Sequence, residues 1–583
     1  MLEECLNNLG RRGIKIKLDV NSYIIIYRRP ISEVKKNLRD NGVDNFISLN
    51  NQCGVIYPPE NYDVKNLNNI DVIDWWEEST PMSTMINITN DLQNGVNIAT
   101  ASGISSFNNP YVNLSGKGIL VAIIDSGIDY LHEDFIKKDG TSKIVSIWNQ
   151  DCDKLKPPDN MTFGCEYSND EINQAIKDNN SDLCIDKIGS GTIAAGIVAS
   201  EGNGRDIYKG IAPNAELIVV KLREYKDIYK KGKINYESTD FLAAISYVIA
   251  VSKSLNRPLI INFSVGATST LLYNLSILNT FTDLYQPGIV IVSGAGNEGN
   301  TDIHYSGKIK KGMLFNKEDY QDIILQEGDD TNLDITINFL GVDKVKVALI
   351  SPSGEIGRIA EYGPDNMRIV GRFNLENTDY FIEYNLPWLL SGTTVIKIRL
   401  KDIKPGIWTI RIIPQYIING NFNLYIPNRN IISPTTRFLD GDSSFTITRF
   451  ALLKGVITVG VYNQKTNSMW LGSSKGPHGE NQLKPDIVAS GVDIISTYIN
   501  NTYNTATGSG VSSSIVCGVL ALIMEYISNE TDLSRYSLYG EPLKTYLMIG
   551  ATKNTLYSYP NISQGFGLLN YKNTIIKIAK NIN

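Results

Sequence analysis

The sequence has no run of lysine and arginine dense enough to make a basic patch, and its 583 residues carry a net charge of -6 at pH 7. Because nucleic-acid binding needs clustered positive charge, we expect no nucleic-acid partner. The longest uninterrupted apolar run, residues 515–524, is about half of the roughly 20 residues that a membrane-spanning helix requires. We therefore expect no membrane span.

Secretion signals and cysteine motifs are also missing. The chain opens Met1-Leu2-Glu3-Glu4, without a basic start followed by an apolar core, so we expect no signal peptide and synthesis in the cytoplasm. The six cysteines include no Cys-x-x-Cys pair: Cys5, Cys53, Cys152, Cys165, Cys184 and Cys517. A reduced chain with buried thiols is the expectation, and one disulfide among Cys152, Cys165 and Cys184 is the alternative.

The length predicts several domains. At the N-terminus, residues 14–18, 23–27, 45–49 and 54–57 have the pattern of strands, and residues 31–41 that of an amphipathic helix. This first alternating unit ends near residue 85. A separate small α+β domain is the simplest interpretation of the pattern alone.

A buried parallel strand is predicted at residues 119–124, where six apolar residues stand in a row after Gly118. The strand ends in Asp125, followed by Ser126-Gly127. Functional residues of open α/β sheets lie at the carboxyl ends of the strands. Asp125 is therefore a candidate site residue.

Three further motifs follow. Gly189-Ser190-Gly191-Thr192 opens a helix of small residues, the apolar run at 289–292 leads into Gly296-Asn297-Glu298, and Gly508-Ser509-Gly510 opens a long apolar helix. The stretch at 294–299 also fits a G-x-G-x-x-G pattern. A dinucleotide fingerprint must open a helix, and the polar, turn-like residues 300–302 do not, so we expect no nucleotide cofactor.

In this order the motifs resemble those of the subtilisin-like serine proteases, the S8 subtilases. The resemblance covers nearly the whole chain and implies an α/β fold, a parallel sheet flanked by helices. It places the triad at Asp125, Ser190 and Gly510 and the oxyanion-hole amide at Asn297. It also implies that Ser264-Val265-Gly266 is the strand that pairs edge-to-edge with an extended substrate.

The chain departs from this family at two catalytic positions. Ser190 stands where the family has its general base, and a hydroxyl has no useful basicity near pH 7. Gly510 stands where the family has its nucleophilic serine, and glycine has no side chain to attack with. The sequence therefore predicts a pseudoprotease, with no active catalytic residue. The alternative is a weakly active or specialised serine endopeptidase.

No other residue is expected to replace the lost groups. The three histidines, His132, His304 and His478, are interpreted as surface or loop residues. Ser509 matches a family threonine that points away from the scissile bond, and the serines at 512–514 are expected on a helix face turned toward the core. Without a base, none of these hydroxyls is activated.

The resemblance also implies a domain organisation. Residues 1–85 match an N-terminal α+β prodomain, which an inactive chain would retain and which would cover the former substrate site beside residues 264–266. Residues 86–300 and 446–583 form the pseudocatalytic domain. Short alternating strands at residues 301–445 predict an inserted all-β jelly-roll sandwich. Its acidic turn at 327–330 is expected to be solvated, so no metal is predicted.

This combination resembles the Csp family of spore-forming clostridia, most closely its CspC type, with the CspA type as the near alternative. The resemblance implies a regulator of bacterial spore germination that resides in the mature spore, in the cortex or coat region. Its expected partners are a sister Csp protease or pseudoprotease and a small germinant, either a bile salt or an amino acid. These functions rest on the family alone.

Overall fold

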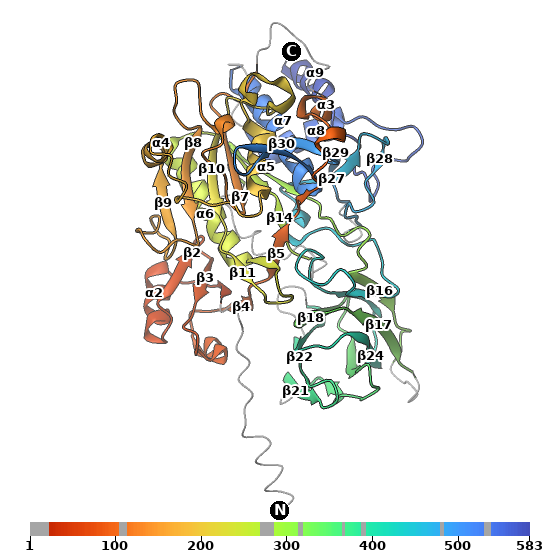
Figure 1. Cartoon of the computed structure of the whole chain (residues 1–583). Coiled ribbons are helices and arrows are strands. Elements are labelled where there is room, and N and C mark those ends of the chain that lie inside the picture. The colour runs from red at the N-terminus through yellow and green to blue at the C-terminus, as the bar shows by residue number, and fades with distance from the viewer. Residues whose placement is uncertain are drawn as a thin grey trace, which may run out of the picture. The chain divides into compact units, whose positions relative to one another are not determined.

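The computed structural model describes residues 22–103, 114–268, 285–312, 319–363, 368–385, 392–477, 483–529 and 538–582 (Figure 1). The chain divides into two compact units, Met1–Ser79 and Thr80–Asn583. The strand predicted at 14–18 and the histidine at 478 lie outside the described residues.

The described residues of the first unit, 22–79, form a four-stranded antiparallel sheet with one α-helix. The sheet order is β2-β3-β1-β4, and the elements are β1 (Tyr23–Ile26), α2 (Ile31–Asp40), β2 (Asn45–Ser48), β3 (Cys53–Tyr57), the 3-10 helix η1 (Val64–Asn69) and β4 (Trp75–Glu78). Val34 and Leu38, one turn apart on α2, are buried in the core of this unit, which explains the amphipathic helix pattern. The unit ends at Ser79 and not at residue 85, because the next residues pair with strands of the second unit.

The second unit is built on a mostly parallel sheet in the order β28-β27-β15-β13-β7-β10-β8-β9, with β29 also paired to β27. Only β8–β9 and β27–β28 are antiparallel pairs of this sheet. Its strands are β7 (Leu120–Asp125), β8 (Ile144–Asn149), β9 (Cys165–Ser168), β10 (Glu216–Lys221), β13 (Leu259–Phe263), β15 (Ile289–Gly294), β27 (Val456–Asn463), β28 (Ser468–Met469) and β29 (Ile487–Ser490).

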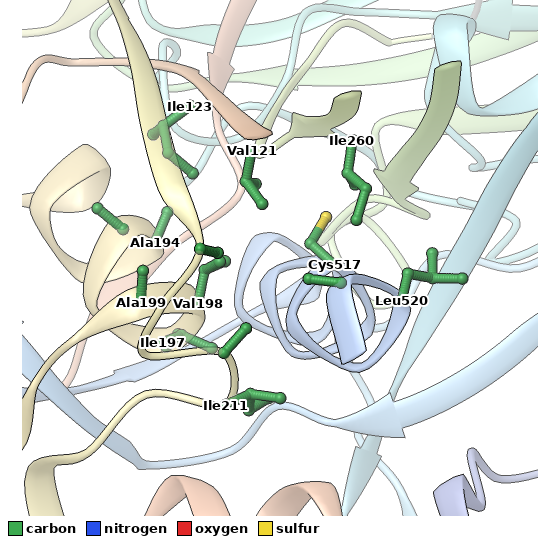
Figure 2. Close-up of a cluster of buried hydrophobic side chains, with 14 of the residues drawn as sticks. Val121, Ile123, Ala194, Ile197, Val198, Ala199, Ile211, Ile260, Cys517 and Leu520 are labelled. Atoms are coloured by element: carbon green, nitrogen blue, oxygen red, sulfur yellow. The ribbon is translucent and has the colours of Figure 1, made fainter. Parts of the chain in front are cut away.

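Helices cover both faces of this sheet (Figure 1). They are α3 (Ile98–Ser102), α4 (Asn169–Lys177), α5 (Ser190–Ala199), α6 (Ser238–Leu255), α7 (Ser509–Asn529), α8 (Gly540–Gly550) and α9 (Tyr571–Ile582). On one face, Val121 and Ile260 of the sheet pack with Cys517 of α7, beside α5 (Figure 2). On the other face, Phe241 of α6 meets Phe263 of β13 edge to face. The predicted α/β architecture with a parallel sheet is therefore confirmed.

Helix α7 is the one described helix that is long and apolar enough to cross a membrane. However, 94% of its apolar window is buried inside the protein, and its side chains form part of the largest core cluster. A core helix of a soluble domain has the same composition, so α7 is explained by its packing.

Residues 304–438 form an antiparallel sandwich of two sheets, ordered β16-β25-β18-β23-β22-β21 and β20-β19-β24-β17-β26. The strands are β16 (His304–Lys308), β17 (Gln321–Glu327), β18 (Asn332–Phe339), β19 (Lys344–Ile350), β20 (Ala360–Glu361), β21 (Arg368–Phe373), β22 (Thr378–Asn385), β23 (Val395–Lys401), β24 (Gly406–Tyr416), β25 (Asn421–Tyr425) and β26 (Arg437–Phe438). Their inward side chains make one shared core, as the alternating sequence pattern predicts.

The expectation of a reduced chain is wrong, and its alternative, one disulfide among Cys152, Cys165 and Cys184, is confirmed. Cys152 and Cys165 form a disulfide, with their Cα atoms 5.4 Å apart, so the chain is not fully reduced. The pairing follows from the fold, since the antiparallel β8–β9 pair sets Cys165 opposite Asn149, three residues before Cys152. Among the described residues, Cys53, Cys184 and Cys517 are buried and take no part in a disulfide.

Candidate functional site

Asp125 ends β7, fully buried at the carboxyl edge of the parallel sheet. Its carboxylate accepts hydrogen bonds from the Ser126 backbone N–H at 2.7 Å and from the hydroxyls of Ser190 and Ser264. Burial raises the pKa of the Asp125 carboxyl above its usual range, and the two serine hydrogen bonds oppose that shift. Asp125 is thus a fully bonded buried carboxylate.

Ser190 is the first residue of α5, so its position is fixed by the helix start. Asp186 anchors this start by accepting hydrogen bonds from the backbone N–H groups of Gly189 at 2.7 Å and Thr192 at 3.0 Å. A carboxylate at a helix N-terminus satisfies otherwise unpaired N–H groups. The Ser190 hydroxyl lies 2.9 Å from that of Ser126 and donates to Asp125, so the base position is occupied by a hydroxyl that is already bonded.

Two hydrogen-bond donors converge on one backbone carbonyl, that of Met85. The Asn297 side-chain amide and the Gly510 backbone N–H each lie 3.0 Å from the Met85 oxygen. The Asn297 oxygen in turn accepts from the Ser509 N–H at 2.9 Å, which orients the amide. This arrangement is an oxyanion hole occupied by a peptide carbonyl.

Among the described residues, the position that faces this carbonyl from the start of α7 is Gly510, which has no side chain. A Cβ atom added at Gly510 would lie 3.2 Å from the Met85 carbonyl carbon. Gly510 is therefore the residue of α7 that lies beside the Met85–Ile86 peptide bond. The Ser509 hydroxyl accepts from the Gly296 N–H at 3.0 Å and donates toward the Met85 sulfur at 3.5 Å. The Ser509 hydroxyl therefore points toward the Met85 side chain and not toward the Met85 carbonyl.

The three following serines are all bonded inside the core. Ser512 donates to the carbonyls of Ala489 and Ser490, both at 3.1 Å. Ser513 and Ser514 each bond the Gly510 carbonyl and the Asn262 side chain. These contacts agree with a helix face turned toward the core.

The described histidines were expected in surface or loop positions, and both are buried: His132 lies in a loop, whereas His304 begins strand β16. His132 accepts from the Asp134 N–H through Nδ1 and bonds the Thr502 carbonyl through Nε2 at 2.9 Å. His304 lies in the sandwich between the Asp442 carbonyl and the Asn423 side chain. Neither has a hydrogen bond to Asp125 or to the Met85 carbonyl, so neither replaces the missing base.

The peptide that carries the Met85 carbonyl is a strand of the chain itself. Strand β5 (Pro81–Thr84) lies between β12 (Ile234–Glu237) and β14 (Val265–Gly266), in a sheet ordered β11-β12-β5-β14 with β11 (Tyr225–Lys226) at the edge. Thr84 pairs with Val265 and Ser83 with Gly266, and the Met85 N–H donates to the Ser264 carbonyl at 2.8 Å. The predicted substrate strand, Ser264-Val265-Gly266, is therefore paired along its edge.

The residues after the Met85–Ile86 bond are also held by a neighbouring strand. Strand β6 (Asn87–Ile88) pairs with β31 (Thr502–Thr507), which forms a hairpin with β30 (Ile494–Tyr498). The Thr89 N–H then donates to the Thr505 carbonyl at 2.9 Å. Residues 80–89, hereafter the resident strand, are thus held on both sides of the Met85–Ile86 bond, whose carbonyl lies in the oxyanion hole.

The acidic turn of the sandwich was expected to be solvated, and this holds for Asp329, whose side chain is 69% exposed, but not for Glu327 and Asp330. Glu327 and Asp330 are each 3% exposed. Asp330 accepts from the Ser433 N–H at 2.6 Å and from the Thr436 hydroxyl at 2.5 Å, and burial raises the pKa of Glu327 to about 7. No group of three metal-ligating side chains occurs in the described part of the chain.

Sequence reasoning missed three parts of this site. The Met85–Ile86 bond has no signal of its own, because the strand that carries it pairs with residues about 150 and 180 positions away. Asn428 and Asn430, which bond the resident strand, stand in an ordinary Pro-Asn-Arg-Asn turn. Tyr236 of β12 is buried, its hydroxyl lacks a partner among the described residues, and burial raises its pKa, with the Asp125 and Asp186 charges adding to the shift.

Three features define the subtilisin-like class. Asp125 ends a central strand of the parallel sheet, Ser190 begins helix α5, and the oxyanion hole lies at the start of helix α7. The chain belongs to the subtilase family, whose family model matches residues 116–348 and 420–567. The region between the two matches lies within the sandwich.

Among solved structures, the chain is similar to the CspB protease of Clostridium perfringens, with a TM-score of 0.72 and 28% identity over 83% of this chain and 97% of that one. Among curated proteins, it is 25% identical to the PII-type proteinase of Lactococcus lactis subsp. cremoris over 80% of this chain, and 22% identical to the C5a peptidase of Streptococcus pyogenes over 70%. It spans only 26% and 35% of the length of these two relatives.

Proposed function

We propose that this chain is a catalytically inactive subtilase that keeps its own strand in the former substrate site. One observation carries the proposal: the Met85 carbonyl accepts from the Asn297 amide and from the Gly510 N–H, at a position where residue 510 has no side chain. In subtilisin, loss of the nucleophile or of the base alone lowers kcat by about 10⁶. Both positions lack the required side chain here.

Labelling with a fluorophosphonate probe tests the absence of a nucleophile. We expect no adduct on the native chain, because each hydroxyl of residues 509–514 is bonded elsewhere and Ser190 offers no base. An active subtilase serves as the positive control. A stoichiometric adduct, mapped by mass spectrometry to any serine of α7, would instead support the alternative of a weakly active endopeptidase.

For the biological role, we propose a regulator of bacterial spore germination of the CspC type, with the CspA type as the near alternative. Two observations support it: the likeness to a Csp protease over most of the chain and the replacement of both Ser and His positions. As a regulator, the chain would sense a bile salt or amino-acid germinant, control an active sister Csp protease, or do both. It would act in the mature spore.

Calorimetric titration separates the two regulatory roles. Taurocholate and glycine, titrated separately into the full chain, represent the bile-salt and amino-acid classes. We expect saturable heat with one of them if the chain is a sensor. Absence of heat with both, together with co-purification of an active Csp protease on the tagged chain, would leave only the role of controller. Absence of both results would contradict the proposed role.

A further inference from the structure

The inserted sandwich contributes one loop to the former substrate site. Residues 427–431 connect β25 to β26 and so belong to the sandwich by sequence. Two of their side chains, Asn428 and Asn430, bond the resident strand. The sandwich is therefore in direct contact with the peptide, in addition to the strands of the α/β domain that pair with it.

Asn428 bonds a side chain of the resident strand and a wall of the site at once. Its amide nitrogen donates to the Ser83 hydroxyl at 3.1 Å and to the Gly266 carbonyl at 2.8 Å. Its oxygen accepts from the Thr268 hydroxyl. The side chain is 2% exposed, and the bonds to Gly266 and Thr268 orient its amide toward Ser83.

Asn430 spans the Met85–Ile86 bond. Its amide nitrogen donates to the Thr84 carbonyl at 2.9 Å, before that bond, and to the Asn87 side-chain oxygen at 3.3 Å, after it. A single side chain thus holds both halves of the peptide. The bond to Asn87 depends on the type of residue at that position, unlike a bond to the backbone.

The opposite wall is fixed to the same sandwich. The loop between β11 and β12 inserts Tyr229 into the sandwich core, where its hydroxyl donates to Asp334 at 3.0 Å. The Tyr229 carbonyl accepts from the Thr331 N–H at 2.6 Å. Strand β12, which follows this loop, pairs with β5. The sandwich therefore positions the strands on both sides of the peptide as well as bonding its side chains.

We propose that loop 427–431 is a peptide-reading element that determines which segment the site holds. Ladder hydrogen bonds are indifferent to sequence, whereas Asn428 and Asn430 bond the side chains of Ser83 and Asn87. The ligand class is an extended peptide whose carbonyl lies in the oxyanion hole. It has a hydroxyl side chain at the position of Ser83, three residues before the bond that follows this carbonyl, and an amide side chain at the position of Asn87, two residues after that bond. In this chain, that ligand is residues 80–89. The assignment concerns peptide selection and goes beyond the proposed inactivity and germinant sensing.

Hydrogen exchange measured by mass spectrometry on the full chain tests this element. Asn428→Ala and Asn430→Ala are each expected to speed amide exchange in residues 82–89 by roughly tenfold, because each removes hydrogen bonds that hold the strand, buried at Asn428 and part-buried at Asn430. Asn419→Ala is the matched control. Its side chain accepts from Asn421 within a turn of the same sandwich, and this variant is expected to leave residues 82–89 unchanged.

Variants of the resident strand exclude a merely structural effect on the sandwich. Ser83→Ala removes the partner of Asn428 without touching the loop, and the double variant Ser83→Ala, Asn428→Ala is expected to exchange no faster than Asn428→Ala alone. The same holds for Asn87→Ala with Asn430→Ala. Unchanged exchange in residues 82–89, fully additive effects, or an equal effect of Asn419→Ala would overturn the proposal. These outcomes do not depend on whether the chain is catalytically active.

Discussion

A chain carrying Ser190→His and Gly510→Ser together is expected to cut itself once, between Met85 and Ile86. The Met85 carbonyl already accepts from Asn297 and from the Gly510 N–H at 3.0 Å. A Cβ at residue 510 would lie 3.2 Å from the carbonyl carbon, which places a serine hydroxyl within reach of attack. Position 190 adjoins Asp125, so an imidazole there can be oriented and stabilised as the imidazolium.

The self-cleavage experiment has matched controls. Gly510→Ser alone supplies a nucleophile without a base, and Ser190→His with Gly510→Ala supplies a base without a nucleophile. By the subtilisin precedent, each should be slower by about 10⁶. The added Cβ also meets the Ile86 side chain at 2.7 Å, and this flexible side chain has to turn aside. Cleavage at another bond, or equal cleavage in a control, would contradict the positions assigned to the lost triad.

Lys484→Ala is expected to destabilise the α/β domain strongly. The Lys484 ammonium group is 1% exposed and donates to Asp486 at 2.7 Å and to the Val456 carbonyl at 2.8 Å. Removal of one partner leaves the Asp486 charge buried and unpaired, which costs about 3–5 kcal/mol. We expect calorimetry at pH 7 to show an unfolding midpoint lower by about 3–5 °C, because the unit that contains Lys484 spans Thr80–Asn583.

An exposed ion pair in the same domain provides the control. Lys465 and Asp493 are also 2.7 Å apart, but their side chains are 31% and 21% exposed. Lys465→Ala is therefore expected to cost at most about 1 kcal/mol. Adding Asp486→Asn to Lys484→Ala should recover part of the loss, because no unpaired charge remains. Equal midpoints for the Lys484 and Lys465 variants would show that the buried pair is not structurally important.

The pH dependence of the buried pair has a defined sign. Burial lowers the pKa of Lys484 to about 8 from the ordinary 10.5 of lysine, against the attraction of Asp486. Between these two values, the unfolded chain binds more protons than the folded chain. The contribution of Lys484 to the free energy of unfolding therefore increases as the pH rises from about 8 to 10.5.

Much of the site was predictable from sequence because its parts are local. Asp125 ends a continuous apolar strand, and Ser190 and Gly510 stand at glycine-rich helix starts, so residue type and backbone geometry appear together in short motifs. Their order along the chain then indicates the class. The sandwich was predictable for the same reason, since alternation of polar and apolar residues is also a local pattern.

The remaining parts depend on contacts between distant segments. His132 looks exposed in its polar loop, yet it is buried because Thr502, 370 positions away, bonds its ring. The Cys152–Cys165 disulfide depends on which strands pair. Asn428 and Asn430 are turn residues in sequence and gain their role only where the sandwich meets the resident strand. No local pattern encodes such contacts.

The most direct test of the central claim is the intact mass of the unmodified 583-residue chain, purified from a foreign host and measured under denaturing conditions. In the proposed function, the Met85 carbonyl lies in the oxyanion hole of its own chain, and the site has neither a nucleophile nor a base. We therefore predict a single species of 64.7 kDa that stays uncut during prolonged incubation. Denaturation is essential, because residues 80–85 would remain paired to β12 and β14 after a cut. A species that begins at Ile86 would show that the site is active and contradict the account.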